Sequence, residues 1–111
     1  MTKLNLAVVG VVNHNNHILI GKKTHRENDI LSEKWHVPGG KVELGEHPNE
    51  AIVREIMEET NINVKVSKVL DVRLVKKADR FVVVIWYECQ PLETTIASSE
   101  ELVNVKWIPK K

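Results

Sequence analysis

The segment from about residue 48 to residue 60 constrains the fold most, because it carries the clearest helical pattern in the chain. Pro48 suits the first helical position, and Asn61 is, after glycine, the residue that best accepts the left-handed conformation that ends many helices. At about 100° per residue, apolar residues fall on one side and three glutamates with one alanine fall on another: Ile52, Val53, Ile56 and Met57 against Ala51, Glu55, Glu58 and Glu59. The sequence therefore predicts one helix with a packing face and an acidic face.

The other regular segments have the valine-rich composition of β-strands. Residues 4–12 and 17–20 are separated by 13–16, whose asparagines tolerate turn conformations, so they predict a hairpin. Further strands are expected at 64–75, 81–87 and 102–108. A strand-rich chain with one central helix predicts an α+β or mixed α/β fold whose sheet is mixed or antiparallel.

Two segments connect the predicted hairpin to the helix, and they predict different structures. Residues 22–34 are polar without a sustained period, which predicts a surface loop. Residues 35–38 run into Gly39 and Gly40, where Pro38 stops ladder bonding and the glycines permit a backbone approach that other residues resist. We expect another part of the molecule to come close to this backbone.

Composition limits the classes of partner. A chain of 111 residues with 42% hydrophobic residues fits one domain over 1–111, and its net charge of +1 gives no general attraction to nucleic acid or an anionic membrane. The apolar start at 4–12 lacks a cleavage site and is far shorter than the ~20 residues that span a bilayer. The single Cys89 excludes an intramolecular disulfide, so a reducing, cytoplasmic setting is expected.

The three glutamates of the helix form a candidate metal site. Glu55, Glu58 and Glu59 stand at i, i+3 and i+4, so their Cβ atoms lie roughly 5 to 6 Å apart and their charges repel. Hard, oxygen-rich ligands at this spacing are what Mg²⁺ requires. The alternative is a solvated helix face whose repulsion is screened by water and salt.

The surroundings of the three glutamates resemble the Nudix box. Gly40, five residues, Glu46, seven residues and then Arg54-Glu55-Ile56-Met57-Glu58-Glu59-Thr60-Asn61-Ile62 match it at every fixed position but one. At average residue usage, so many spaced matches arise by chance about once in a million such chains. The departure is Asn61 where the family usually has glycine, and the helix should still end there. Residues 35–43 and 105–108 also look like family segments.

This resemblance implies an α/β/α sandwich around a mixed β-sheet, in which relatives usually carry a second helix after the late tryptophan strand. This chain stops at Lys111, so that C-terminal helix is expected to be missing. An uncovered apolar sheet face of more than a few hundred Å² is uncommon in monomers. We therefore expect a homodimer, a covering loop, or a truncated form of a longer protein.

The resemblance also implies site roles. The expected Mg²⁺ ligands are Glu55, Glu58, Glu59, the carbonyl at Gly39 and an acidic residue of a late loop, Glu101 with Glu100 as second choice. Arg54 either orients a catalytic glutamate or pairs with Glu50 or Glu58 one turn away. Glu46 more simply braces the loop or the helix start.

Candidate substrate contacts are less specific. Lys41 and either Lys22 or Lys23 occupy positions where relatives often hold phosphate-binding cations, although a solvated lysine is the common alternative. Trp35 lies beside the expected site and can stack on a base, whereas Trp107 is expected in the core.

The reaction implied is hydrolysis of a nucleoside diphosphate linked to another group, with Mg²⁺ as cofactor, Mn²⁺ as a substitute and Glu55 as the general base. Residues 76–78 lack the proline that some relatives cleaving ADP-ribose carry in this region. A nucleoside triphosphate pyrophosphohydrolase, releasing a nucleoside monophosphate and pyrophosphate, is therefore expected. The alternatives are an ADP-ribose or nucleotide-sugar pyrophosphatase and a non-catalytic Nudix-fold module that binds a nucleotide.

Overall fold

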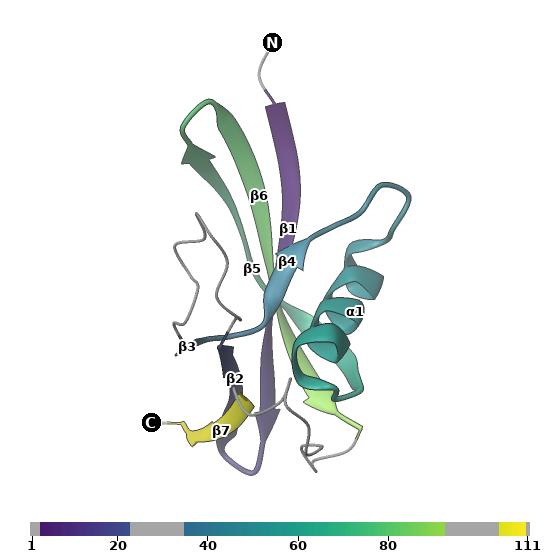
Figure 1. Cartoon of the computed structure of the whole chain (residues 1–111), viewed down its shortest axis with the longest axis vertical. Helices are drawn as coiled ribbons and strands as arrows, with labels where there is room; N and C mark the ends of the chain where they lie inside the picture. Colours follow the sequence, from purple (N-terminus) through teal and green to yellow (C-terminus); the bar gives the residue numbers. More distant parts are fainter. Residues whose placement is uncertain (1–2, 23–34, 93–104, 111) are drawn as a thin grey trace.

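The computed structural model describes residues 3–22, 35–92 and 105–110. It contains one helix and seven strands in these ranges: β1 (Lys3–His14), β2 (His17–Lys22), β3 (Trp35–His36), β4 (Gly39–Lys41), α1 (Pro48–Thr60), β5 (Val64–Lys77), β6 (Arg80–Pro91) and β7 (Val105–Pro109). The strands form one sheet that β1 organises (Figure 1).

Strand β1 is shared between two parts of this sheet. Along one edge β1 pairs in parallel with β6, and the ladder runs from the Lys3–Arg80 pair to the Val12–Cys89 pair. Strand β6 pairs antiparallel with β5 on its other edge. The other edge of β1 pairs antiparallel with β4 near its middle and with β2 at its end. Strand β2 in turn carries β3 and β7. The predicted mixed sheet with one helix is confirmed, because a parallel pair is combined with antiparallel ones.

Both hairpin turns are tighter than the sequence indicated, so the strands are longer. Asn15 and Asn16 have φ values of 48° and 64°, the left-handed pair that a two-residue hairpin turn uses. The predicted 4–12 and 17–20 hairpin is therefore confirmed, with β1 reaching His14. Between β5 and β6 only Ala78, at φ 50°, and Asp79 remain outside the strands.

The segment around Pro38 forms two short strands that the sequence did not predict. Trp35–His36 pairs with β2, and Gly39–Lys41 pairs with β1. Pro38 lies between them and its carbonyl accepts a hydrogen bond of 2.9 Å from the Gly10 N–H. The expected close approach is confirmed, since a Cβ at Gly39 would overlap the Val8 carbonyl. Of the predicted loop 22–34, Lys22 belongs to β2 and the rest lies outside the described residues.

Helix α1 has the predicted bounds, and both ends are capped. At its start the His47 side chain accepts from the Asn49 N–H at 3.0 Å, and Glu50 accepts from the His47 N–H at 2.9 Å, which completes a capping box. At its end Asn61 is left-handed, with φ 60°, and its N–H donates to the Met57 carbonyl. The predicted C-terminal cap is confirmed.

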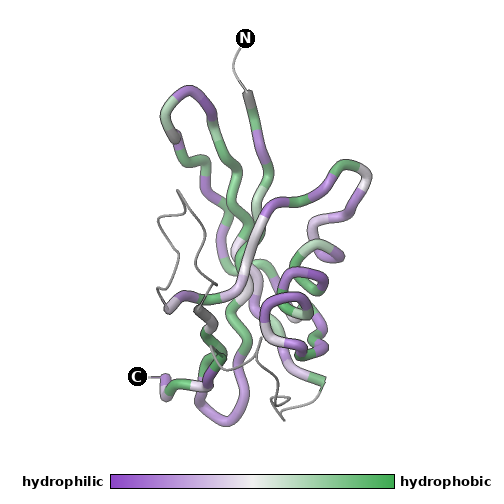
Figure 2. Tube along the Cα trace, viewed as in Figure 1, coloured by the Kyte–Doolittle hydropathy of each residue, from purple (hydrophilic) through white to green (hydrophobic). Residues whose placement is uncertain are grey.

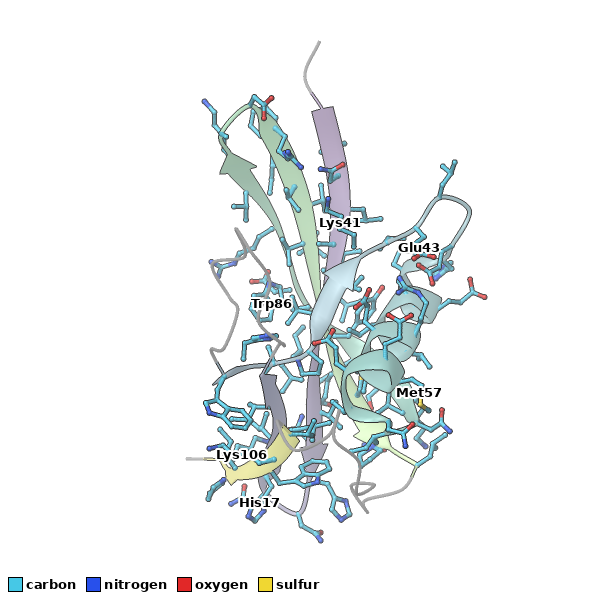
Figure 3. All side chains as sticks on the ribbon, in the orientation of Figure 1. His17, Lys41, Glu43, Met57, Trp86 and Lys106 are labelled. Atoms are coloured by element: carbon cyan, nitrogen blue, oxygen red, sulfur yellow. The ribbon has the colours of Figure 1, made fainter. Side chains whose placement is uncertain are left out.

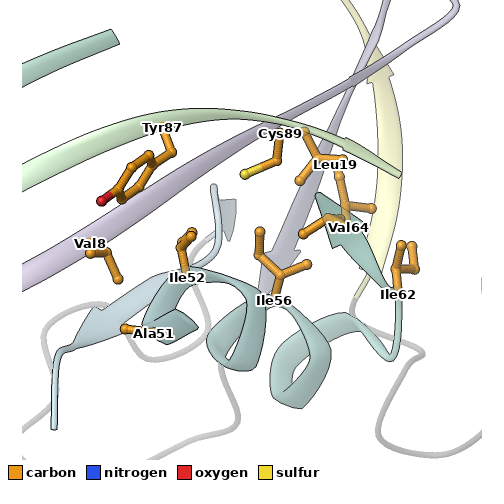
Figure 4. Packing of buried hydrophobic residues seen from close by; sticks show 10 residues of the cluster. Val8, Leu19, Ala51, Ile52, Ile56, Ile62, Val64, Tyr87 and Cys89 are labelled. Atoms are coloured by element: carbon orange, nitrogen blue, oxygen red, sulfur yellow. The ribbon is translucent and has the colours of Figure 1, made fainter. Parts of the chain in front are cut away.

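The core lies between α1 and the sheet (Figure 4). Ile52 and Ile56 are fully buried against β1 at Gly10, where an added Cβ would stand 2.8 Å from Ile56 Cδ1. The placement of Ala51 on the acidic face was wrong: Ala51 is fully buried, and Val53 is only partly so. The helix contacts β4 as well as β1, and this second contact rotates its buried stripe towards Ala51.

Within the described ranges α1 is the one helix, and it lies on one face of the sheet (Figure 1). The second helical layer of the expected sandwich is not among these residues. No helix in this part of the chain has the length and apolar character needed to cross a membrane.

Candidate functional site

Arg54 is the centre of a charged cluster between α1 and the loop that precedes it. Its Nε and Nη2 donate to the two carboxylate oxygens of Glu46 at 2.7 and 3.0 Å, the two-pronged geometry that favours arginine over lysine. Hydrogen bonding to Arg54 lowers the pKa of Glu46 to about 2, and the same contact raises the pKa of Arg54. Glu46 also accepts from the Glu43 N–H. The prediction that Glu46 braces the loop is confirmed.

The remaining nitrogen of the guanidinium contacts the acidic face of the helix. Arg54 Nη1 donates to Glu55 at 2.9 Å and to Glu58 at 3.2 Å. One atom of Arg54 thus makes both the contact to Glu55 and the expected pairing with Glu58 one turn away, while the orientation of a catalytic glutamate stays a prediction. Glu50 takes part in the capping box instead. Arg54 Nη2 also donates to the Lys41 carbonyl at 3.1 Å, which ties the helix to the end of β4.

The carboxylate of Glu55 lies directly over Gly40. A Cβ at Gly40 would stand 2.5 Å from both carboxylate oxygens, so the site has room for Glu55 only because residue 40 has no side chain. The Glu55 side chain is 16% exposed and is held on its other side by Arg54. Among the glutamates of α1, Glu55 thus has its position fixed from two directions.

The side chains of Glu59 and Glu58, on either side of Glu55, differ in how firmly they are held. The Gly39 N–H donates to a Glu59 carboxylate oxygen at 3.3 Å, so Glu59 also reaches β4. The Glu58 side chain is 58% exposed, and among the described residues it accepts a hydrogen bond from Arg54. All three glutamates therefore stand on the side of α1 that meets β4 and the Arg54 cluster.

The donor chemistry of these residues suits a hard divalent cation, because each offers carboxylate oxygens and the Gly39 backbone runs beside them. As the side chains lie, however, no group of three histidine, cysteine or acidic residues in the described ranges is gathered closely enough to hold an ion. The Arg54 guanidinium stands between Glu55 and Glu58. Binding a metal would require Glu58 to rotate, which its exposure permits. Glu101 and Glu100 lie outside the described residues.

Of the residues expected to contact substrate, Lys41 and Trp35 lie within the described ranges and Lys23 does not. Lys41 is exposed on β4 close to the acidic cluster (Figure 3). Trp35, 41% exposed on β3, is covered on one face by the Lys106 ammonium, 4.2 Å from the ring centre. Trp107 packs against the core as expected.

Two charged residues near these positions were missed by sequence reasoning. Lys106 reaches Trp35 because β2 pairs with both β3 and β7, and no local pattern signals that contact. Glu43, in the loop after β4, comes within 3.8 Å of Arg54. Glu43 precedes the helix, which begins at Pro48, so helical spacing could not indicate its pairing with Arg54.

Comparison with known proteins agrees with this geometry. The model of the NUDIX domain family matches residues 1–111. An 8-oxo-dGTP diphosphatase of Escherichia coli (strain K12) is 46% identical over 63 residues, which are 56% of this chain and 46% of that protein. An ADP-ribose pyrophosphatase of Methanocaldococcus jannaschii is 43% identical over 67 residues, 60% of this chain and 38% of that protein. The chain thus matches less than half the length of these two relatives.

The fold comparison extends over nearly the whole chain. The crystal structure of a NUDIX hydrolase from Nitrosomonas europaea superposes with a TM-score of 0.81 at 19% identity, covering 98% of this chain and 59% of that one. At this identity the likeness shows a shared fold, while the family model shows membership over the full length. With the box residues gathered around Arg54 as described, the chain belongs to the Nudix hydrolase family.

Proposed function

We propose that this chain hydrolyses the pyrophosphate linkage of a nucleoside triphosphate, releasing a nucleoside monophosphate and pyrophosphate. The observation that carries the proposal is the position of Glu55, held between the Arg54 guanidinium and the bare backbone of Gly40. A carboxylate whose position is fixed from two sides is suited to take a proton from a water molecule in a defined geometry. The similarity to a protein named 8-oxo-dGTP diphosphatase supports the choice of substrate class.

Mg²⁺ would be held by Glu55, Glu58, Glu59, the Gly39 carbonyl and Glu101, with Mn²⁺ as a substitute. When bound, such an ion neutralises phosphate charge and lowers the pKa of a coordinated water. The proposal does not require all of these oxygens to converge beforehand, because Glu58 is exposed and free to turn.

The chain's own residues would supply positioning and proton transfer. Glu55 accepts the proton of the attacking water, and Arg54 holds Glu55 in place through Nη1 while Glu46 holds Arg54 through its other two nitrogens. Lys41 and Lys23 would offset phosphate charge. Trp35 would stack on the base with its indole ring.

The second candidate is hydrolysis of ADP-ribose or a nucleotide sugar, and the similarity to a protein named ADP-ribose pyrophosphatase favours it. The third is a module that binds a nucleotide without cleaving it. The retention of Glu55, Glu58 and Glu59 speaks against that module, because carboxylates that repel each other on one helix face bring no benefit to simple binding.

The deciding experiment incubates the protein and Mg²⁺ with nucleoside triphosphates, ADP-ribose and nucleotide sugars, and separates the products by chromatography. A nucleoside monophosphate plus pyrophosphate from a triphosphate is the expected result. Two phosphorylated fragments from ADP-ribose alone would select the second candidate. Binding without any product, unchanged by a chelator, would select the third. Glu55→Gln is the control that separates hydrolysis by this site from a contaminating activity.

The proposal extends to assembly and setting. We place residues 1–111 in one domain, as the extent of the family match supports. We further propose a homodimer, because apolar side chains of the sheet remain exposed, among them Leu4 and Leu74. A cytoplasmic setting is proposed from the single cysteine, Cys89, which is buried as a free thiol.

A further inference from the structure

The long strand β5 ends the sheet. In the strand order β3-β2-β1-β6-β5 its inner edge pairs with β6, and none of the described strands pairs with its outer edge. A strand edge presents a row of N–H and C=O groups that can pair with another chain. Proteins commonly blunt such edges with charged residues, lysine above all, with proline, with short strands or with bulges. Strand β5 has 14 residues, no proline, two bulges and four lysines, Lys65, Lys68, Lys76 and Lys77. The part free of lysine, proline and bulges is 71–75.

Those bulges divide β5 into two parts. Its register with β6 shifts between Val66 and Lys68 and again between Val69 and Asp71. From Asp71 onwards the pairing is regular to the end of the strand. The regular part is the one whose outer edge is flat enough to accept a further strand. Figure 1 shows this part of β5 beyond the region covered by α1.

The two faces of this regular part differ in character. Val72 lies opposite Ile85, which lies opposite Val8 beneath α1, so Val72 and Leu74 are on the helix side of the sheet. Both are more than half exposed, at 56% and 64%. On the other side Arg73 Nε donates to Asp71 at 2.7 Å. In Figure 2 this part of β5 alternates between hydrophobic and hydrophilic colours.

A second copy of this chain fits this edge best in one register. Antiparallel pairing about a two-fold axis perpendicular to the sheet places one residue opposite itself. An axis at Asp71 or at Arg73 would oppose like charges. An axis at Leu74 would oppose Asp71 to Lys77, but it would also set Lys76 against Val72 on the apolar side. An axis at Val72 opposes Asp71 of each copy to Arg73 of the other, beside the pair already formed within each chain. Of these registers, the one at Val72 brings opposite charges together next to the axis and sets Val72 and Leu74 opposite apolar residues.

We infer that the outer edge of β5 is a self-association surface, at which two copies pair antiparallel about Val72 and close an alternating ring of two Asp71 and two Arg73 side chains. Val72 meets Val72 on the helix side of the joined sheet, and Leu74 lies towards Leu70 of the other copy. The bulge at Leu70 ends the regular ladder on either side of the axis. The interface is therefore short, and the dimer is expected to form reversibly.

Cysteine cross-linking tests the register. In Val72→Cys the two new thiols face each other across the axis, and mild oxidation should convert most of the protein to a covalent dimer. In the matched control Leu74→Cys the two thiols are separated by about 13 Å along the strands, so little dimer should form. Cys89 gives no background, because it is fully buried and burial raises its pKa to about 11. Equal cross-linking of both variants, or cross-linking of Leu74→Cys alone, would overturn the register.

Charge reversal tests the ring independently, by sedimentation of the unmodified chain and its variants up to about 1 mM. Asp71→Arg and Arg73→Asp should each weaken dimerisation about ten-fold or more, and the double swap should restore it to within about three-fold. Lys65→Asp, which makes the same charge change as Arg73→Asp on the irregular part of β5, should leave it unaltered. A monomer at every concentration refutes the inference, as does a dimer that the reversals do not weaken. Hydrolysis is not measured, so neither outcome bears on the proposed activity.

Discussion

Alanine substitution should lower turnover at Gly40 but lower the stability of the fold at Gly39, and Gly40→Ala is the sharper test of the site. Its added Cβ would stand 2.5 Å from both oxygens of Glu55, where ordinary contact begins at 3.4 Å. The carboxylate must therefore retreat by about 1 Å, a displacement that can cost about 10²-fold in turnover when it affects a positioned group. We expect turnover to fall by that factor.

Stability should change much less in Gly40→Ala. The atoms that must move are the far end of a flexible side chain, and the Glu55 to Arg54 hydrogen bond is partly exposed to solvent. Its loss is offset in part by the lower conformational entropy of alanine in the unfolded chain. The unfolding free energy should stay within about 1 kcal/mol of the parent, a shift of roughly 5 °C in Tm.

Gly39→Ala and Gly45→Ala complete the test. A Cβ at Gly39 meets backbone atoms, with Val9 Cα at 3.1 Å, so β4 must separate from β1 and stability should fall by about 1–3 kcal/mol. At Gly45 nothing lies within 4 Å, but φ is 84°, so alanine should cost about 1 kcal/mol and leave turnover intact. Steady-state kinetics and thermal unfolding measure both quantities. Native turnover in Gly40→Ala would refute the role of Gly40 in positioning Glu55.

Four further outcomes are expected. Glu58→Gln should slow turnover by roughly 10²-fold while the Tm of the metal-free protein stays nearly constant, and near-normal turnover would remove Glu58 from the site. Glu46→Gln should lower the Tm at neutral pH. Because the folded pKa of Glu46 is about 2 against an ordinary 4.5, its stabilisation is complete above pH 4.5 and lost towards pH 2, so wild-type and variant Tm values should converge over that range. Asn61→Ala should cost about 1 kcal/mol in thermal unfolding because φ is 60°, whereas Asn61→Gly should cost little; equal losses would contradict the cap. Ile56→Ala should cost about 2–5 kcal/mol in denaturant unfolding, and a smaller loss would mean that the core under α1 collapses to fill the gap.

The sequence by itself determined the elements whose signals are local. Pro48 and Asn61 predicted both ends of α1 because each restricts the backbone at its own position, and the asparagines at 13–16 predicted the first hairpin for the same reason. The spacing of Gly40, Glu46 and Arg54 from the three glutamates indicated the family without any knowledge of how these residues meet. Even the bracing role of Glu46 followed from its place before a helix.

The tertiary structure decided everything that depends on which strands become neighbours. It buried Ala51 because β4 crosses the helix face, and it brought Lys106 over Trp35 because β2 pairs with two strands distant in sequence. It also placed Gly40 beneath Glu55, which turns a permissive residue into a requirement of the site. Side-chain patterns repeat within one element and predict that element, but a contact between elements depends on the register and twist of the whole sheet, to which every strand contributes.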